Sequence, residues 1–210
     1  MKKSLGIILS VLIGMMLFAG CGENVTAESD LVYVDKKGGV TSVDVGELDQ
    51  SYYSQEELKS FVEDEVEQYT TANGKGTVSL KDLSVENGVA KLTLAYDTVE
   101  DYVGFNGIEL YQGKVVKALA DGYGFDVDFK TVEDGKVTET AASSQDIYGD
   151  SNLKAVIIKA NHISVKVPGE ICFVSGDDVE LTAEDTVSIW QDGTPEDSFE
   201  TEVYTYIIYK

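Results

Sequence analysis

The sequence of 210 residues has no Arg, one His, two Cys and two Pro. So few Cys exclude a scaffold held by several disulfides, and so few Pro exclude a proline-rich spacer. A zinc site built from several His or Cys ligands cannot be assembled from this inventory. Lys supplies all 16 basic residues against 38 acidic ones, which gives a net charge of −22. Because phosphate contacts need clustered cations, we expect the folded part to bind neither nucleic acid nor an anionic membrane surface.

Apolar and aromatic residues, by contrast, are present in ordinary amounts. Hydrophobic residues make up 43% of the chain and aromatic residues 10%, which is enough to bury a core despite the charge. Hairpin and helix patterns alternate in the first half, and the second half is mostly β. We therefore predict a single α+β domain over residues 31–210, with antiparallel sheets and about three helices in the first half. A polar stretch at 141–152 is the alternative place for a division into two domains.

The N-terminus has a recognisable layout. Two Lys precede a charge-free apolar stretch over residues 5–18, followed by Ala19, Gly20 and Cys21. This order is typical of a secretory signal peptide and is too short for a stable membrane span. Residues 17–21, Leu-Phe-Ala-Gly-Cys, resemble the lipobox of bacterial lipoproteins, although Phe18 stands where that family usually has Leu. The alternatives are an ordinary signal peptide cut nearby or an N-terminal anchor helix.

The resemblance implies that residues 1–20 are a signal peptide and that Cys21 receives a diacylglyceryl group as the new N-terminus. Residues 21–30 would then be the lipidated Cys and a short tether, holding the domain at the extracytoplasmic face of the cell membrane. Lipid is the fitting anchor, because two or more acyl chains bind stably, whereas so acidic a domain is repelled by an anionic surface. The absence of Arg indicates a Gram-positive source.

Turn sequences predict three hairpins. Asn-Gly at 87–88 and Asp-Gly at 134–135 suit type I′ turns, which need positive φ at both central residues, and Lys-Gly-Gly at 37–39 suits a third. The strands are expected as short apolar or alternating runs: 31–34, 40–45, 78–85, 89–96, 125–132, 155–159, 163–167, 171–174, 179–181, 187–190 and 203–209. The run 203–209 is apolar on both faces. We predict it to be an internal strand, paired on both sides and covered on at least one face.

Three helices are predicted between the hairpins. Ser54 and Glu57 form a capping-box pattern, and Asn73-Gly74 ends that helix. Its inward stripe is expected to be Leu58, Phe61, Val62, Val66 and Tyr69. Shorter helices are expected to begin at Thr98 and to cover 114–121.

The residues suited to catalysis have ordinary structural interpretations. Asn161-His162 reads as a turn between two strands, because Asn and His tolerate positive φ. Cys172 lies in an apolar strand, which favours a buried and unreactive thiol. No Walker A, G-x-G-x-x-G or G-x-S-x-G pattern occurs, and we expect no cofactor.

Ligand-binding candidates are exposed aromatic and acidic residues. Tyr52, Tyr53, Tyr123 and Trp190 could form a platform for a sugar or another flat ligand. Asp177, Asp178 and Glu180 form an acidic loop that suits weak calcium binding. Asp126 and Asp128 are expected on one face of a strand.

Three functions remain open from the sequence. The leading one is a lipid-anchored, non-enzymatic surface protein that binds a glycan, peptide or protein partner. The second is an extracytoplasmic glycan or peptide hydrolase that uses carboxylates, and the third is a structural or assembly accessory lipoprotein. An apolar cleft flanked by aromatic residues would favour the first. Two carboxyl groups facing each other at roughly 5–10 Å in a groove would favour the second, and a flat charged surface the third.

Overall fold

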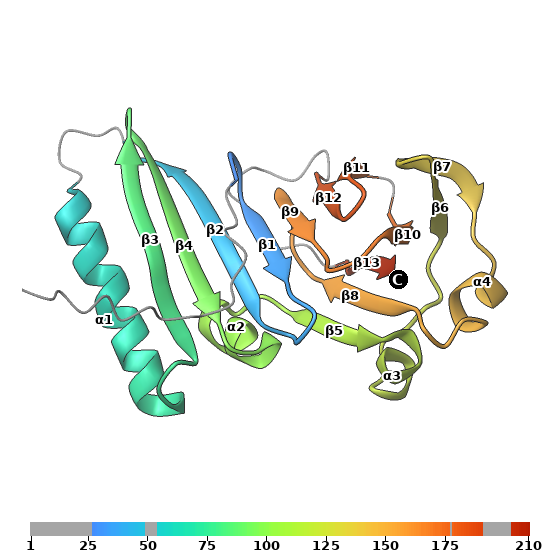
Figure 1. The fold of residues 1–210 in the computed structure, drawn as a ribbon, viewed down its shortest axis with the longest axis horizontal. Coiled ribbons are helices and arrows are strands. Elements are labelled where there is room, and N and C mark those ends of the chain that lie inside the picture. The colour runs from blue at the N-terminus through green and yellow to red at the C-terminus, as the bar shows by residue number, and fades with distance from the viewer. Residues whose placement is uncertain (1–26, 49–53, 177, 191–202) are drawn as a thin grey trace, which may run out of the picture.

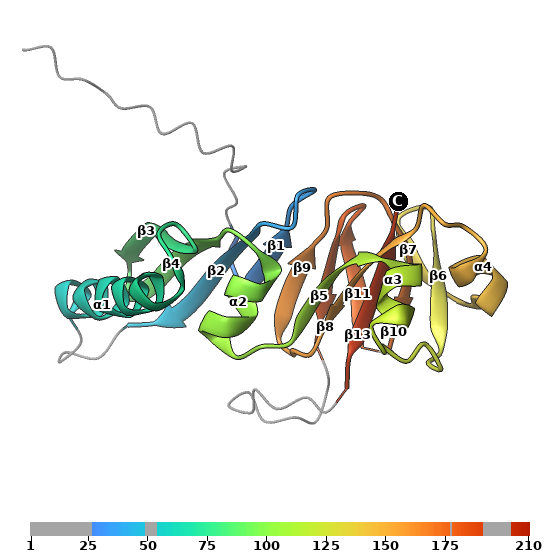
Figure 2. The ribbon, with the colours of Figure 1, turned by 90° about the horizontal axis from the view of Figure 1, so that it is seen from below.

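The computed structural model describes residues 27–48, 54–176, 178–190 and 203–210. The fold is α+β, as predicted, with two sheets and with the described helices all before residue 149 (Figure 1). These helices are α1 (Gln55–Asn73), α2 (Val99–Asn106), α3 (Val115–Ala120) and α4 (Ser144–Tyr148). Figure 2 shows α1 toward one end of the long axis and α4 toward the other.

The seven-stranded sheet A joins the beginning of the chain to its later part. Its spatial order is β11 (Val179–Ala183), β12 (Thr186–Ile189), β9 (Ile163–Lys166), β1 (Leu31–Val34), β2 (Val40–Glu47), β4 (Val89–Tyr96) and β3 (Val78–Glu86). Strand β1 pairs in parallel with β9, with Leu31 opposite Ser164, and the other neighbours are antiparallel. Sheet A is therefore assembled from both halves of the sequence.

The six-stranded sheet B is antiparallel throughout. Its order is β5 (Leu110–Lys114), β8 (Lys154–Ile158), β13 (Thr205–Tyr209), β10 (Ile171–Ser175), β6 (Phe129–Glu133) and β7 (Lys136–Ala141). Strand β13 lies between β8 and β10, so the prediction that 203–209 contains an internal strand is confirmed.

Both faces of β13 are covered, because its residues alternate between two hydrophobic clusters. Ile207 and Tyr209 join the larger cluster, which also contains buried residues of sheet A such as Val165. Tyr206 and Ile208 join the smaller one, with residues of α3 and α4. All five residues of the strand are buried. Burying apolar side chains on both faces gives this strand a central place in the fold.

The predicted hairpins are all present. Asn87 and Asp134 have φ of 53° and 50°, and the Gly after each is also at positive φ, as type I′ turns require. Gly38, with φ of 93°, lies in the turn between β1 and β2. His162 has φ of 55° in the β8–β9 turn, which confirms its interpretation as a turn residue.

Helix α1 begins and ends where its cap residues predict. The Ser54 hydroxyl accepts a hydrogen bond from the Glu57 N–H at 3.3 Å, and the Gly74 N–H donates to the Thr70 carbonyl. One member of its predicted inward stripe is wrong. Val62 is buried, but Phe61 is 62% exposed, because neighbouring helical positions point about 100° apart at 3.6 residues per turn.

One further prediction, about Asp126 and Asp128, is corrected. Asp126 and Asp128 do not share a strand face, because β6 begins only at Phe129. Phe125 and Phe129 instead pack on the Tyr206 ring at 5.0 and 5.8 Å, which holds the segment between them out of the sheet.

The stretch 141–152 is more ordered than its polar composition indicated. It contains α4, whose capping box joins Ser143 and Asp146, and Ile147 of this helix is buried. One buried apolar side chain per short helix is too little for a periodic pattern, so the sequence did not reveal α4.

The segment before β1 is also fixed to the sheet. The Val45 N–H donates to the Asp30 carboxylate at 2.7 Å, and the Lys91 ammonium lies 2.9 Å from the Glu28 carboxylate. Within the predicted tether 21–30, residues 28 and 30 therefore bind sheet A.

Candidate functional site

The predicted binding residues fall into two groups. Cys21, Tyr52, Tyr53 and Asp177 lie outside the described residues, so the structure gives no account of them. Tyr123, Trp190, Asp178 and Glu180 are described, and they lie in three different surroundings.

Tyr123 belongs to a group of three half-buried rings, here called the tyrosine cluster: Tyr111, Tyr123 and Tyr204. The Tyr123 ring centroid lies 4.9 Å from that of Tyr111 and 5.9 Å from that of Tyr204. The cluster packs against the smaller hydrophobic core cluster. Tyr123 is thus a packing residue with a partly wet ring.

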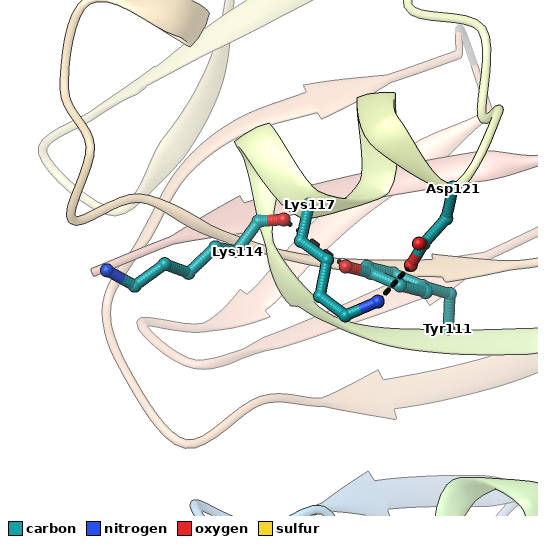
Figure 3. Close-up of polar contacts among 4 residues, drawn as sticks. All are labelled: Tyr111, Lys114, Lys117 and Asp121. Carbon is teal, nitrogen blue, oxygen red and sulfur yellow. Dashed lines mark hydrogen bonds and ion pairs between the residues drawn. The ribbon is translucent and has the colours of Figure 1, made fainter.

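Polar groups around the tyrosine cluster are paired with one another. Figure 3 shows the Tyr111 hydroxyl donating to the Lys114 carbonyl at 3.3 Å, with the ion pair between Lys117 and Asp121 beside it. Burial, with the nearby charge of Asp121, raises the pKa of Tyr111 to about 12.

Tyr204 completes this pairing. Its hydroxyl donates to the Glu109 carboxylate, and this hydrogen bond is the main cause that raises the pKa of Tyr204 to about 12. The Lys159 ammonium lies 3.6 Å from the Glu109 carboxylate and 5.9 Å from the centre of the Tyr204 ring. The two carboxylates beside the cluster, Glu109 and Asp121, are therefore each paired with a Lys of the chain.

Trp190 is separate from that cluster. It is 52% exposed and follows β12, where its ring meets the His162 ring edge-on at 4.3 Å. Trp190 and the turn residue His162 therefore form a pair of rings beside sheet A.

Among the described residues, the acidic loop shows no group of metal ligands, and Cys172 is not set up as a nucleophile. Asp178 and Glu180 are both exposed, and the described positions hold no group of three or more metal-ligating side chains. Since Asp177 is not described, the calcium site stays a prediction. Cys172 is half-buried, its thiol donates to the Glu170 carbonyl at 3.6 Å, and burial raises its pKa. A raised thiol pKa disfavours the nucleophilic thiolate.

A hollow lies elsewhere, between α1, α2 and sheet A; we call it the α1–α2 groove. Its volume is about 580 Å³, within the range of small-molecule sites. It is lined by residues of β2, α1, β4 and α2: Asp44, Phe61, Val62, Glu65, Gln68, Tyr69, Leu92, Leu94, Gly104, Phe105 and Asn106. Figure 1 shows α1 running along β3 and α2 beside the ends of β2 and β4.

Aromatic packing sets the two helices against the sheet. The Phe105 ring of α2 meets the Tyr69 ring of α1 at 5.5 Å and the Tyr96 ring of β4 at 5.8 Å, both edge-on. Gly104 leaves room for this approach, because a Cβ there would lie 2.5 Å from the Tyr69 hydroxyl and the Tyr69 ring would have to shift. Phe61 lines the groove and remains exposed.

A chain of polar side chains runs along the sheet beneath α2. The Ser42 hydroxyl donates to the Asp44 carboxylate at 3.1 Å and lies 3.4 Å from the Tyr96 hydroxyl. The Tyr96 hydroxyl donates to the Asn106 side-chain oxygen at 3.4 Å. Both ends of the chain, Asp44 and Asn106, line the groove. Burial raises the pKa of Tyr96 to about 12.

Asp44 is a carboxyl of this groove whose pKa is raised. Its side chain is exposed, yet the protein packed around it raises its pKa by desolvation. The hydrogen bond from Ser42 opposes this shift, and the negative charge of Asp30 adds to it. A carboxyl with a raised pKa in a hollow is a candidate functional group.

The sequence carries one sign of this groove, in strand β2. In β2, Ser42 and Asp44 alternate with Thr41 and Val43, so two polar residues lie on the face that β4 shares through Leu94 and Leu92. Polar side chains on a face otherwise apolar indicate either a ligand site or a buried network. The part of the groove lining that α1 supplies could not be predicted from the sequence, because the apolar spacing of α1 places Phe61 on the stripe that faces the core.

Comparison of the chain with protein-family models, with curated proteins and with solved structures finds no match. In the parts of the chain that the structure describes, none of the helices has the length and apolar composition that crossing a membrane requires.

Proposed function

We propose that this chain is a lipid-anchored protein of the extracytoplasmic membrane face that binds a ligand, without catalysis, in the α1–α2 groove. One observation carries the binding role: an exposed aromatic ring, Phe61, flanks a groove of about 580 Å³ whose floor bears a polar chain ending at Asp44. A large apolar side chain left at a hollow, beside a few placed polar groups, is the usual make-up of a binding site.

The anchor rests on the sequence 17–21 and on the charge of the chain. The small residues before Cys21 match a lipobox, and a net charge of −22 gives no electrostatic attraction to an anionic membrane. Because residues 28 and 30 already bind sheet A, few residues separate Cys21 from the folded part, and the groove would work close to the bilayer.

The anchor is tested with Cys21→Ala. Cells that express the wild-type chain or this variant are labelled with a radioactive fatty acid, and the protein is recovered by immunoprecipitation. We expect label on the wild type only, with the variant retained as precursor or released in soluble form. Label that persists on Cys21→Ala would overturn the lipoprotein assignment.

The groove is tested with Phe61→Ala. Val116→Ala is a matched control, because Val116 of α3 is also an exposed apolar residue, 47% exposed, that does not line the groove. Fragments are screened by saturation-transfer NMR against the wild-type chain in nanodiscs. We expect the fragments that bind the wild type to lose at least fivefold in affinity with Phe61→Ala and less than twofold with Val116→Ala. Equal losses, or no fragment bound, would remove the groove as a site.

The hydrolase remains a second candidate for one reason: two carboxylates, Asp44 and Glu65, line the same groove, and the pKa of one of them is raised. A carboxyl with a raised pKa near a second carboxylate suits acid–base cleavage of a glycosidic bond. Turnover of aryl glycosides or peptide substrates that is abolished by both Asp44→Asn and Glu65→Gln would replace the binding function with this one.

A further inference from the structure

The charges that line the α1–α2 groove are of one sign. Asp44 and Glu65 bring two carboxylates, and no Lys lines the groove. Every Lys after residue 3 lies in the described part of the chain, and within that part neither carboxylate forms an ion pair. The contrast with Glu63 is direct, since this neighbour on α1 lies 3.8 Å from the Lys59 ammonium.

Asp44 has little internal compensation for its charge. Its carboxylate accepts a hydrogen bond from Ser42, and the nearby Asp30 has the same sign. A partly desolvated carboxylate is stabilised best by a cation within a few ångströms. Since no described Lys pairs with this carboxylate, a cationic ligand would meet a negative charge that the chain itself leaves uncompensated.

The rest of the lining suits an apolar body and a positive charge together. Phe61, Tyr69 and Phe105 bring aromatic rings to the groove, and the faces of such rings attract cations. Leu92 and Leu94 add an aliphatic floor. An anion would meet two carboxylates and the field of a chain with net charge −22, which repels it before contact.

We propose that the α1–α2 groove binds a small organic cation, an ammonium group on an aromatic or aliphatic body. The ammonium lies between Asp44 and Glu65, and the body covers Phe61 and Leu92. A groove of about 580 Å³ has the size of a small-molecule site. This inference rests on the proposed function, because it names the ligand class of the same groove.

The test uses three probes that share one ring and differ in charge: tryptamine, tryptophol and indole-3-acetate. Each is equilibrated by dialysis against the full chain in phosphatidylcholine nanodiscs at pH 7, with empty discs as the reference. We expect tryptamine to bind at least tenfold more tightly than tryptophol, and indole-3-acetate to stay unbound. Tryptophol bound as tightly as tryptamine would overturn the cation inference and leave the groove as a site. No binding of any probe would count against both.

Variants of the two carboxylates locate the charge. Asp44→Asn and Glu65→Gln should each weaken tryptamine binding about five- to tenfold and leave tryptophol within twofold. Glu63→Gln is the matched control, because it removes the same charge from α1 at a position outside the groove, and it should change tryptamine affinity less than twofold. An equal loss in all three variants would mean that tryptamine responds to net charge, and it would overturn the proposed position of the ammonium.

Discussion

The tyrosine cluster and the α1–α2 groove are built from the same kinds of residues and end with opposite electrostatics. Each combines aromatic rings with carboxylates. In each, a Tyr hydroxyl lies close to a Gly, in space that a side chain on that Gly would occupy: Tyr111 against Gly113 and Tyr69 against Gly104. In the tyrosine cluster, Glu109 is held by Tyr204 and Lys159. In the groove, Asp44 has a hydrogen bond from Ser42 and, among the described residues, no ion pair.

The difference shows how residues that only pack can be distinguished from residues of a candidate binding site in a very acidic chain. Acidic residues are so abundant here, 38 in all, that their presence on a surface indicates nothing. What distinguishes Asp44 is that the fold desolvates it and supplies no cation. Exposed aromatic residues need the same scrutiny: Tyr123 is engaged by two other rings, whereas Phe61 is 62% exposed beside a hollow.

The largest expected effect separates the closed centre of sheet B from the open groove. Ile207 is fully buried in β13, so Ile207→Ala should lower the free energy of unfolding by about 2–5 kcal/mol through lost burial and a cavity. Phe61→Ala removes a larger side chain, but an exposed one, and should change it by only about 0.5 kcal/mol. Urea denaturation of both variants measures this. Comparable losses would show that Phe61 is a core residue and that the groove is closed in solution.

A smaller effect tests the pairing in the tyrosine cluster. Tyr204→Phe removes the hydrogen bond to Glu109 and should cost about 0.5–1 kcal/mol at neutral pH. The pKa of Tyr204 is raised from 10.0 to about 12, so this contribution is complete below pH 10 and is lost as the pH rises toward 12. Urea denaturation at several pH values should show the two proteins converging above pH 10.

Tyr123→Phe is the control for that experiment. It keeps a ring of the same cluster and removes a hydroxyl that makes no hydrogen bond with the described residues, so it should cost less than about 0.5 kcal/mol. If both variants lost equal stability, the ring contacts rather than the bond to Glu109 would hold the cluster, and the contrast with the groove would weaken.

Local chemistry explains what could be predicted of this fold. The turns at 87–88 and 134–135 and the cap at Ser54 depend on a few adjacent residues, and the two apolar faces of β13 are visible in its alternation. The parallel pairing of β1 with β9 could not be predicted, because strands far apart in the chain leave no local sign of their register.

The groove escaped prediction for a related reason. It forms where α1 and α2 meet two strands, and the position of Phe61 depends on how far α1 rotates over β3. The heptad-like spacing puts Phe61 and Val62 on one stripe, but successive helical residues point about 100° apart, and here Val62 faces the sheet while Phe61 lies at the edge. The aromatic candidates chosen for exposure alone, Tyr123 and Trp190, proved to contact other rings.

The smallest expected effect concerns the charge of Asp44 itself. Because its pKa is raised in the folded protein above the ordinary value of 3.8, the folded state holds a proton that the unfolded chain has already released. Stability therefore falls, relative to an uncharged side chain, as the pH rises from about 3.8 through the raised pKa. Asp44→Asn keeps an acceptor for Ser42 and should equal the wild type in acid. At neutral pH it should be more stable by less than about 1 kcal/mol, since water in the groove screens the charge.

Asp146→Asn should change the pH dependence of stability in the opposite direction, so it serves as a reference for the same measurement. Hydrogen bonds from the Ser143 hydroxyl and N–H lower the pKa of Asp146, so the wild type should gain stability over this variant as the pH rises through the acid range. Urea denaturation between pH 3 and 7 should therefore give difference curves of opposite slope for the two variants. Parallel slopes would show that Asp44 is an ordinary paired carboxylate. Opposite slopes, with tryptamine binding weakened in the more stable Asp44→Asn variant, would mean that the fold sacrifices stability at the groove for ligand binding.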